Sequence, residues 1–234
     1  MDQEKIWQYH QDPEKSTSFD SNRGRLRYVA TKILAHESVL NIGVCKAWRE
    51  EQLKKRGICV STLDPDEEAI ARLRKYFKVS ENNAKVGYSQ EIPFGDQTFD
   101  VVVMSEVLEH LNNDILARTL EEVSRVLRDG GRFLGTVPAN ENLASSETIC
   151  PACGNQFHRW GHEQSFNKKR LEKILGSVFP DVWVRAVFLA APDELNLKGK
   201  IVWFLKKIQN LLGLQSSNDR FFFECRSHKE VGIA

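Results

Sequence analysis

Four residues whose side chains bind transition metals lie close together in one polar stretch of the sequence. Cys150 and Cys153 flank a two-residue turn, and His158 and His162 follow them. Thiolates and imidazoles at this kind of spacing suit tetrahedral zinc, which would also fix the shape of a segment with little apolar content. We therefore expect these four residues to bind zinc, with a metal-free lid over a substrate pocket as the alternative.

A second group of ionisable residues lies earlier in the sequence, at Glu106, Glu109 and His110. Side chains at positions i, i+3 and i+4 converge on one face of a helix, where carboxylates and imidazoles can hold a divalent ion. Without an ion, His110 is the first candidate for a general base, with Glu109 beside it. The alternative is that His110 caps a helix or lies at the rim of the core.

The turn Asn41-Ile42-Gly43 follows an expected strand and has the properties of a ligand-binding turn. Glycine lets the backbone pass close to a ligand. Asp64 ends the next expected strand. Its separation from Gly43 along the sequence is about that at which dinucleotide-binding folds place a carboxylate that binds ribose hydroxyls. The later glycines of a pyrophosphate-binding loop are missing, so a nucleoside without pyrophosphate is favoured. A tight turn and a helix-capping Asp64 are the alternative.

Strand-like and helix-like segments alternate along the chain, which predicts an α/β fold with a mostly parallel sheet covered by helices. The expected strands are 38–42, 58–63, 84–88, 99–104, 132–137, 182–189 and 220–225, and the expected helices are 21–36, 46–56, 66–77, 113–128, 167–176 and 197–213. We expect the helix 113–128 to end where Gly130 adopts a left-handed conformation.

We expect one domain over residues 1–234, with three additions to its core. These are a loosely ordered arm at 1–20, the cysteine- and histidine-containing insert at 139–166 and an amphipathic helical appendage at 197–213. The appendage carries lysines beside its apolar residues. We expect it to pack on its own sheet or to form a homodimer, with a membrane surface as the alternative.

The composition excludes several classes of protein. The chain has 33 Lys and Arg against 32 Asp and Glu, a net charge of +1, without the basic excess of a nucleic-acid-binding protein. No apolar run is long enough for stable membrane insertion. The charged amino terminus does not resemble a signal peptide, and five cysteines with one close pair suit a reducing compartment. A cytoplasmic globular protein is therefore expected.

Five motifs together resemble the class I S-adenosylmethionine-dependent methyltransferases over roughly residues 38–138. They are Val39-Leu40-Asn41-Ile42-Gly43, Leu63-Asp64, 92–102, 105–111 and 126–131, in the family's order. The resemblance implies a Rossmann-like, doubly wound, mostly parallel seven-stranded sheet with helices on both faces and an antiparallel last strand. It also implies S-adenosylmethionine as the cofactor, bound by Asn41, Gly43, Asp64, Tyr88, Ser89 and Ser105.

The sequence departs from the family pattern in the cofactor motifs. The pattern Asp-x-Gly-x-Gly-x-Gly has Asn41, Cys45 and Ala47 here, and the family's Gly-Asp-Ala has Tyr88 and Ser89 at its last two positions, so we expect a pocket without those two carboxylates. The resemblance implies methyl transfer to a small-molecule acceptor, such as a sugar or lipid-linked hydroxyl. A binding or regulatory protein that keeps the fold without transfer is the alternative. In small-RNA and quinone-pathway O-methyltransferases, a string similar to Glu106–His110, with a later histidine, holds a divalent ion. The resemblance implies that His162 is that later ligand here, in which case it does not serve the zinc.

Overall fold

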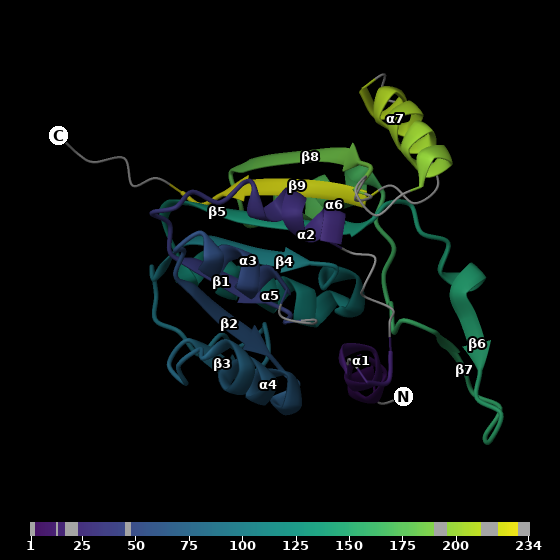
Figure 1. Cartoon of the computed structure of the whole chain (residues 1–234), viewed down its shortest axis with the longest axis horizontal. Helices are drawn as coiled ribbons and strands as arrows, with labels where there is room; N and C mark the ends of the chain where they lie inside the picture. Colours follow the sequence, from purple (N-terminus) through teal and green to yellow (C-terminus); the bar gives the residue numbers. More distant parts are fainter. Residues whose placement is uncertain are drawn as a thin grey trace.

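The computed structural model describes residues 3–12, 14–16, 23–44, 48–189, 196–211 and 220–228. Seven strands form one sheet in the order β3-β2-β1-β4-β5-β9-β8 (Figure 1). The strands are β1 Val39–Ile42, β2 Val60–Asp64, β3 Ala84–Val86, β4 Phe99–Ser105, β5 Leu127–Pro138, β8 Asp181–Val187 and β9 Arg220–Arg226. β9 lies antiparallel between β5 and β8, and the pairs from β3 to β5 are parallel. The predicted fold class is confirmed.

Helices cover both faces of the sheet. On one face, α2 (Arg23–Ala30) and α3 (Trp48–Lys55) pack Val29 and Leu53 against Val101 and Val103 of β4. On the other face, α5 (Asn113–Val126) and α6 (Lys168–Leu175) join the core that contains Val102. Because consecutive strand residues point to opposite faces, β4 must be apolar at nearly every position, which is why its run predicted a buried strand.

A further helix of the core, α4 (Glu67–Phe77), packs beside β3. Its Ala69, Ile70 and Leu73 bury their side chains in a small cluster with Ala84. Asp66 caps the helix by accepting a hydrogen bond from the Glu68 N–H. Since Asp64 lies just before this cap, the start of α4 is held next to the end of β2.

The amino-terminal segment contains a helix where we expected a loosely ordered arm. Residues Gln3–Gln11 form α1, which Figure 1 draws near the right-hand ends of β2 and β4. Little apolar periodicity marks this segment in the sequence, and its position depends on polar contacts of its Trp7 and Gln11 side chains. Such contacts are not visible in a sequence pattern.

The carboxyl end of α5 also differs from the expectation. The helix ends at Val126, and Leu127 is already extended and starts β5. Gly130 does have a positive φ of 72°, but it lies within β5, where its N–H donates to the His228 carbonyl. The glycine therefore shapes the entry to the strand and does not close the helix.

The segment 139–166 leaves the sheet after β5 and returns at Phe166, which bridges to Ala139. It contains a short 3-10 helix (Leu143–Ser146) and a two-stranded hairpin of β6 (Glu147–Ile149) and β7 (Gln156–His158). The hairpin projects beyond the arrowheads of the parallel strands (Figure 1).

The last helix, α7 (Leu197–Leu211), does not bury its apolar side chains on the sheet, which was one of the two arrangements expected for it. Ile201, Phe204 and Leu205 are each more than half exposed, at 55%, 59% and 53%. The reason is the orientation of the helix, whose Lys206 lies over the Phe188 ring of the domain and is on the opposite side from these residues. Within the described residues, no helix is long and apolar enough to cross a membrane.

Candidate active site

The carboxyl ends of β2, β1 and β4 meet at one edge of the sheet. The chain runs outward from β1 to β3 and then crosses back to β4, so the strand order reverses between β1 and β4. Ligands of open α/β sheets bind in the crevice at such a reversal. Asn41 lies in β1, Asp64 ends β2 and Ser105 ends β4, so the fold brings these three predicted residues to the same edge.

Two constraints require glycine at position 43, directly after β1. Its φ is +91°, which residues with a side chain rarely adopt, and an added Cβ would lie 2.9 Å from Cγ2 of Val107. The Gly43 N–H donates to the Leu63 carbonyl at 2.9 Å, which fixes the turn against β2. The departures Cys45 and Ala47 lie outside the described residues.

Asp64 is a buried carboxylate fixed by backbone donors. Its Oδ2 accepts a hydrogen bond from the Val44 N–H at 2.7 Å, and its Oδ1 accepts one from the Asp66 N–H at 2.8 Å. The Gln11 side chain of α1 is a further hydrogen-bond partner. Burial raises the pKa of Asp64 to about 6, and the nearby Asp66 charge adds to this, although the hydrogen bonds act in the opposite direction.

A second carboxylate, which sequence reasoning missed, lies beside Asn41. Glu50 of α3 is 4% exposed and accepts a hydrogen bond from the Asn41 Nδ2. It also accepts one from the Thr62 hydroxyl of β2, at 3.4 Å. The departure from the family pattern at Asn41 predicts a pocket without a carboxylate at this place. The structure corrects this expectation, because Glu50 brings a buried carboxylate to Asn41 from the next helix.

The other residues predicted to bind the cofactor, Tyr88, Ser89 and Ser105, differ in exposure and in their contacts. Tyr88, which follows β3, is 49% exposed and accessible to a ligand. Ser89 is 8% exposed, and its hydroxyl lies 2.9 Å from that of Thr119 in α5. The Ser89 side chain therefore contacts α5, and its role in cofactor binding stays a prediction. The Ser105 hydroxyl lies 2.8 Å from that of Thr136 and links β4 to β5.

Glu106 is held by two arginines at the end of β4. Its Oε2 lies 2.9 Å from Arg25 of α2 and 2.7 Å from Arg220 of β9. Burial favours the neutral acid, but the two guanidinium charges outweigh it and lower the pKa of Glu106. Its φ of 57° is unusual for a residue with a side chain. The suggested role of Glu106 as a metal ligand is therefore corrected, because its charge is already balanced.

Glu109, His110 and His162 form a cluster whose ligand atoms all lie within 4.8 Å of one another. Glu109 is fully buried, and neither of its carboxylate oxygens has a hydrogen-bond partner among the described residues. Burial and then the charge of Glu106 raise the pKa of Glu109 well above its usual value. Because an uncompensated carboxylate is costly to bury, Glu109 must hold a proton or face a cation.

His110 is neutral in this environment. Burial and then the charge of His162 lower the pKa of His110 to about 3. Its Nδ1 lies 3.1 Å from Nε1 of Trp7 and 3.1 Å from the Gly161 carbonyl. An indole N–H only donates and a carbonyl only accepts, so Nδ1 engages one of them at a time. So low a pKa makes His110 a weak general base and favours a role as a ligand or in positioning.

Glu141, which the sequence did not single out, joins His158 to His162. Its carboxylate lies 2.6 Å from Nδ1 of His162 and 3.6 Å from Nε2 of His158. Nδ1 of His158 accepts backbone hydrogen bonds from His162 at 3.1 Å and from Trp160 at 3.4 Å. Nε2 of His158 therefore carries the ring proton and points it toward Glu141.

The four residues predicted to bind zinc are divided between two places. Cys150 and Cys153 lie at the turn of the β6–β7 hairpin, where backbone donors from Cys153 and Ala152 lower the pKa of the Cys150 thiol. His158 pairs with Glu147 at the far end of the hairpin, and the histidines group with Glu141. The predicted four-residue set is therefore not assembled, because the hairpin strands separate the thiols from the imidazoles.

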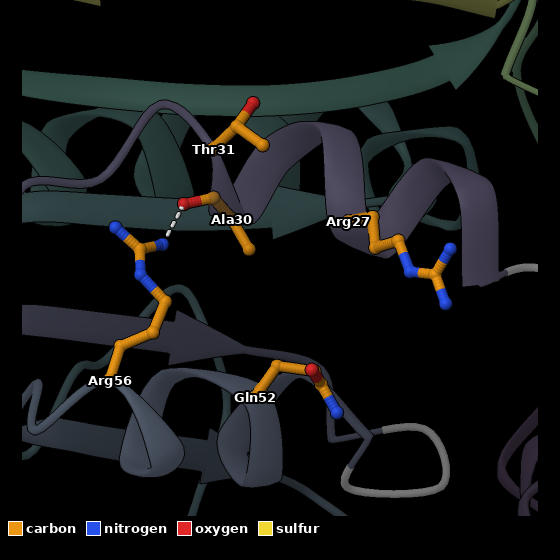
Figure 2. Close-up of a pocket in the computed structure, with 5 residues that line it drawn as sticks. All are labelled: Arg27, Ala30, Thr31, Gln52 and Arg56. Atoms are coloured by element: carbon orange, nitrogen blue, oxygen red, sulfur yellow. Dashed lines mark hydrogen bonds between the residues drawn. The ribbon is translucent and has the colours of Figure 1, made fainter.

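A pocket of about 340 Å³ lies away from this edge, between α2 and α3. It is lined by Arg27, Ala30, Thr31, Gln52 and Arg56 (Figure 2). The Arg56 guanidinium donates to the carbonyls of Ala30 at 2.5 Å and Ile33 at 2.7 Å. These bonds link the end of α2 to the end of α3, so the pocket belongs to the helical layer and does not lie at the strand ends.

Comparison with known proteins agrees with this geometry. Residues 40–135 match the family model described as a methyltransferase domain. An uncharacterized methyltransferase of Mycobacterium bovis is 33% identical over 130 residues, which cover 51% of each chain. The ubiquinone biosynthesis O-methyltransferase of Rickettsia akari is 28% identical over 139 residues, or 55% of this chain and 54% of that one. The chain thus spans about half the length of these curated relatives.

A solved structure gives the same fold. The 1,6-didemethyltoxoflavin-N1-methyltransferase of Burkholderia thailandensis, which was crystallised with S-adenosylhomocysteine, has a TM-score of 0.64 at 16% identity. The likeness covers 97% of this chain and 87% of that one. The structure thus shares the Rossmann-like fold of a solved methyltransferase. Residues 40–135 are thus similar to methyltransferase domains, and this similarity covers less than half of the chain.

Proposed function

We propose that the protein binds S-adenosylmethionine in the crevice at β1, β2 and β4 and transfers its methyl group to a small-molecule acceptor. The observation that carries this proposal is Asp64, a buried carboxylate at the end of β2 beside the turn at Gly43. A carboxylate at this place can accept hydrogen bonds from both hydroxyls of a ribose. Glu50 and Asn41 supply further polar groups at the same edge.

The residues of the candidate site are better suited to aligning the methyl acceptor than to transferring a proton. S-adenosylmethionine supplies an already activated methyl group, so the protein must mainly orient the acceptor for in-line attack. Glu106 is held rigidly by Arg25 and Arg220 next to β4, at the position where cofactor and acceptor would meet. His110, which is neutral, can accept a hydrogen bond from an acceptor hydroxyl or orient it.

We further propose that Glu109, His110 and His162 hold a divalent ion. The residues fit such an ion because both Glu109 oxygens are buried beside two imidazoles, without a partner among the described residues. A bound cation would lower the pKa of a hydroxyl acceptor and fix its position. The zinc expected at Cys150, Cys153, His158 and His162 is not part of this proposal, because the two thiols and the two imidazoles lie at opposite ends of the β6–β7 hairpin.

The acceptor we favour is a hydroxyl on a small molecule, either a sugar or a lipid-linked compound. Two relatives support a hydroxyl or a lipid-like acceptor by their names. One is the ubiquinone biosynthesis O-methyltransferase, and the other is the demethylmenaquinone methyltransferase of Symbiobacterium thermophilum, which is 40% identical over 50 residues. The described cysteines are free thiols, which accords with the expected cytoplasmic location.

Isothermal titration calorimetry with S-adenosylmethionine and S-adenosylhomocysteine tests the proposal. We expect binding of both ligands, loss of binding in Asp64→Ala and normal binding in Asp129→Ala, which removes an exposed acid elsewhere. Absence of heat at millimolar ligand would refute the cofactor assignment. Binding of the cofactor without turnover on any acceptor would favour the alternative, a regulatory protein that has kept the fold.

A further inference from the structure

The helix α7 presents a row of apolar side chains to solvent. Leu197, Ile201, Phe204, Leu205 and Ile208 are exposed by 76%, 55%, 59%, 53% and 38%. At 100° per residue these positions fall on one side of the helix. Exposed apolar residues arranged in a continuous stripe mark an interaction surface, whereas scattered ones need no explanation.

The charge of α7 is entirely positive. Its sequence contains Lys198, Lys200, Lys206 and Lys207 and no Asp or Glu. The helix therefore carries +4 while the whole chain carries +1, which leaves −3 for the remainder. Lys198 flanks the apolar stripe on one side and Lys200 flanks it on the other, and both are exposed.

The stripe faces away from the domain. Lys206, which is on the side of the helix opposite to Leu197 and Ile208, has its ammonium 4.7 Å from the centre of the Phe188 ring. The first turn is capped by Asn196, whose side chain accepts a hydrogen bond from the Gly199 N–H at 2.8 Å. The helix thus has a defined start, the side that carries Lys206 is turned to the domain, and the apolar stripe is turned outward.

We infer that α7 is an interfacial helix that binds the chain to a membrane surface rich in anionic lipids. Amphipathic helices with lysines beside an apolar face lie in the plane of the headgroups, with the apolar side chains in the acyl boundary. The +4 charge complements the negative potential of such a surface. This inference does not depend on methyl transfer.

A homodimer through α7 is less favoured, because the helix offers less surface than a stable dimer buries. A helix of 15 residues is about 22 Å long and about 10 Å wide, a footprint of about 220 Å². A stable dimer buries about 800 Å² on each partner. Two copies of this helix would also bring their lysines together.

The position of α7 relates this surface to the candidate active site. Figure 1 draws α7 beyond the arrowheads of β5 and β8, at the same end of the molecule as the β6–β7 hairpin. A membrane bound by the apolar stripe would thus lie on the side of the molecule where the crevice opens. If the proposed transfer is correct, this arrangement favours an acceptor that resides in the headgroup layer.

Co-sedimentation of the full chain with vesicles tests the inference without cofactor or acceptor. We expect binding to vesicles of phosphatidylcholine with phosphatidylglycerol at three to one, and weak binding to phosphatidylcholine alone. Each lysine near an anionic surface changes partitioning about five-fold, so Lys198→Gln with Lys200→Gln should weaken binding about 25-fold. High salt should produce a similar loss.

The matched variants Ile201→Asp and Val202→Asp distinguish the contribution of the apolar stripe to vesicle binding from the contribution of charge. Both add one negative charge at exposed adjacent positions, but only Ile201 is in the stripe. We expect about 50-fold weaker binding for Ile201→Asp and about five-fold for Val202→Asp. Equal losses in the two variants, or no binding of the parent chain, would overturn the inference. A concentration-dependent dimer in sedimentation velocity that Ile201→Asp dissolves would also overturn it. Calorimetry with S-adenosylhomocysteine on the same variants reports separately on the crevice.

Discussion

Asp64 should make cofactor binding depend on pH in a range that is easily measured. Its pKa is raised to about 6 by burial, and the nearby Asp66 charge contributes to the rise. A ribose donates its hydroxyl hydrogens, so the ionised carboxylate is the better acceptor. With this pKa the ionised fraction falls from about 0.97 at pH 7.5 to about 0.09 at pH 5. We therefore expect S-adenosylhomocysteine to bind about ten-fold more weakly at pH 5.

The same titration also changes the stability of the fold, but stability falls as the pH rises whereas cofactor binding strengthens. The folded pKa of about 6 exceeds the ordinary value of 3.8, so the folded chain binds the proton more tightly than the unfolded chain. The stabilising contribution is complete below about pH 4 and is lost as the pH rises through 6. The shift corresponds to about 3 kcal/mol. Cofactor binding is therefore strongest above pH 6, where protonation of Asp64 no longer stabilises the fold.

Calorimetry at several pH values checks the prediction, with Asp64→Asn as the matched variant. The amide of this variant cannot ionise, so S-adenosylhomocysteine should bind it about 5- to 150-fold more weakly at pH 7.5 and without the pH dependence. One oxygen of the carboxylate is replaced by a donor opposite a backbone N–H, which opposes any gain in stability. A parent affinity that stays flat from pH 5 to 7.5, or an equal slope in the variant, would refute the reasoning.

The remaining predictions concern the metal and the packing of the sheet. Elemental analysis should find about one divalent ion per chain in the parent and in Cys150→Ser, and none in Glu109→Gln; the reverse pattern would move the ion to the hairpin. Gly135→Ala should lower the free energy of unfolding by about 3 kcal/mol or more, because an added Cβ would lie 2.2 Å from a backbone oxygen of β4. Gly95→Ala, whose Cβ would meet Thr98 at an ordinary 3.5 Å, is its control in denaturant titrations.

The sequence predicted the elements that repeat a buried pattern. The apolar run of β4 is unmistakable because both of its faces are covered, and the 3.6-residue period of α4 and α5 follows from one buried face. The helix α1 and the strands β6 and β7 were missed because they are short and polar. Their conformation depends on contacts with distant parts of the chain.

The sequence predicted where on the sheet the candidate site lies, but not which charged side chains surround it. Asp64 and Gly43 were found because their spacing follows the strands. Glu50 was missed because its approach to Asn41 depends on how α3 packs, and no motif marks it. The metal interpretation failed for Glu106 for a related reason. Its two arginines come from α2 and β9, far away in the sequence.

The order of the strands also constrains how the chain can fold during synthesis. Within the described part of the sheet β8 pairs with β9 alone, and β9 is inserted between β5 and β8 although it is made last. Until residues 220–226 leave the ribosome, β5 remains an open edge and β8 has no partner in the sheet. An open edge that carries Phe133 and Leu134 invites pairing with other chains. Nonsense mutations upstream of β9 should therefore produce aggregation-prone products, since they remove two strands from the sheet and not one.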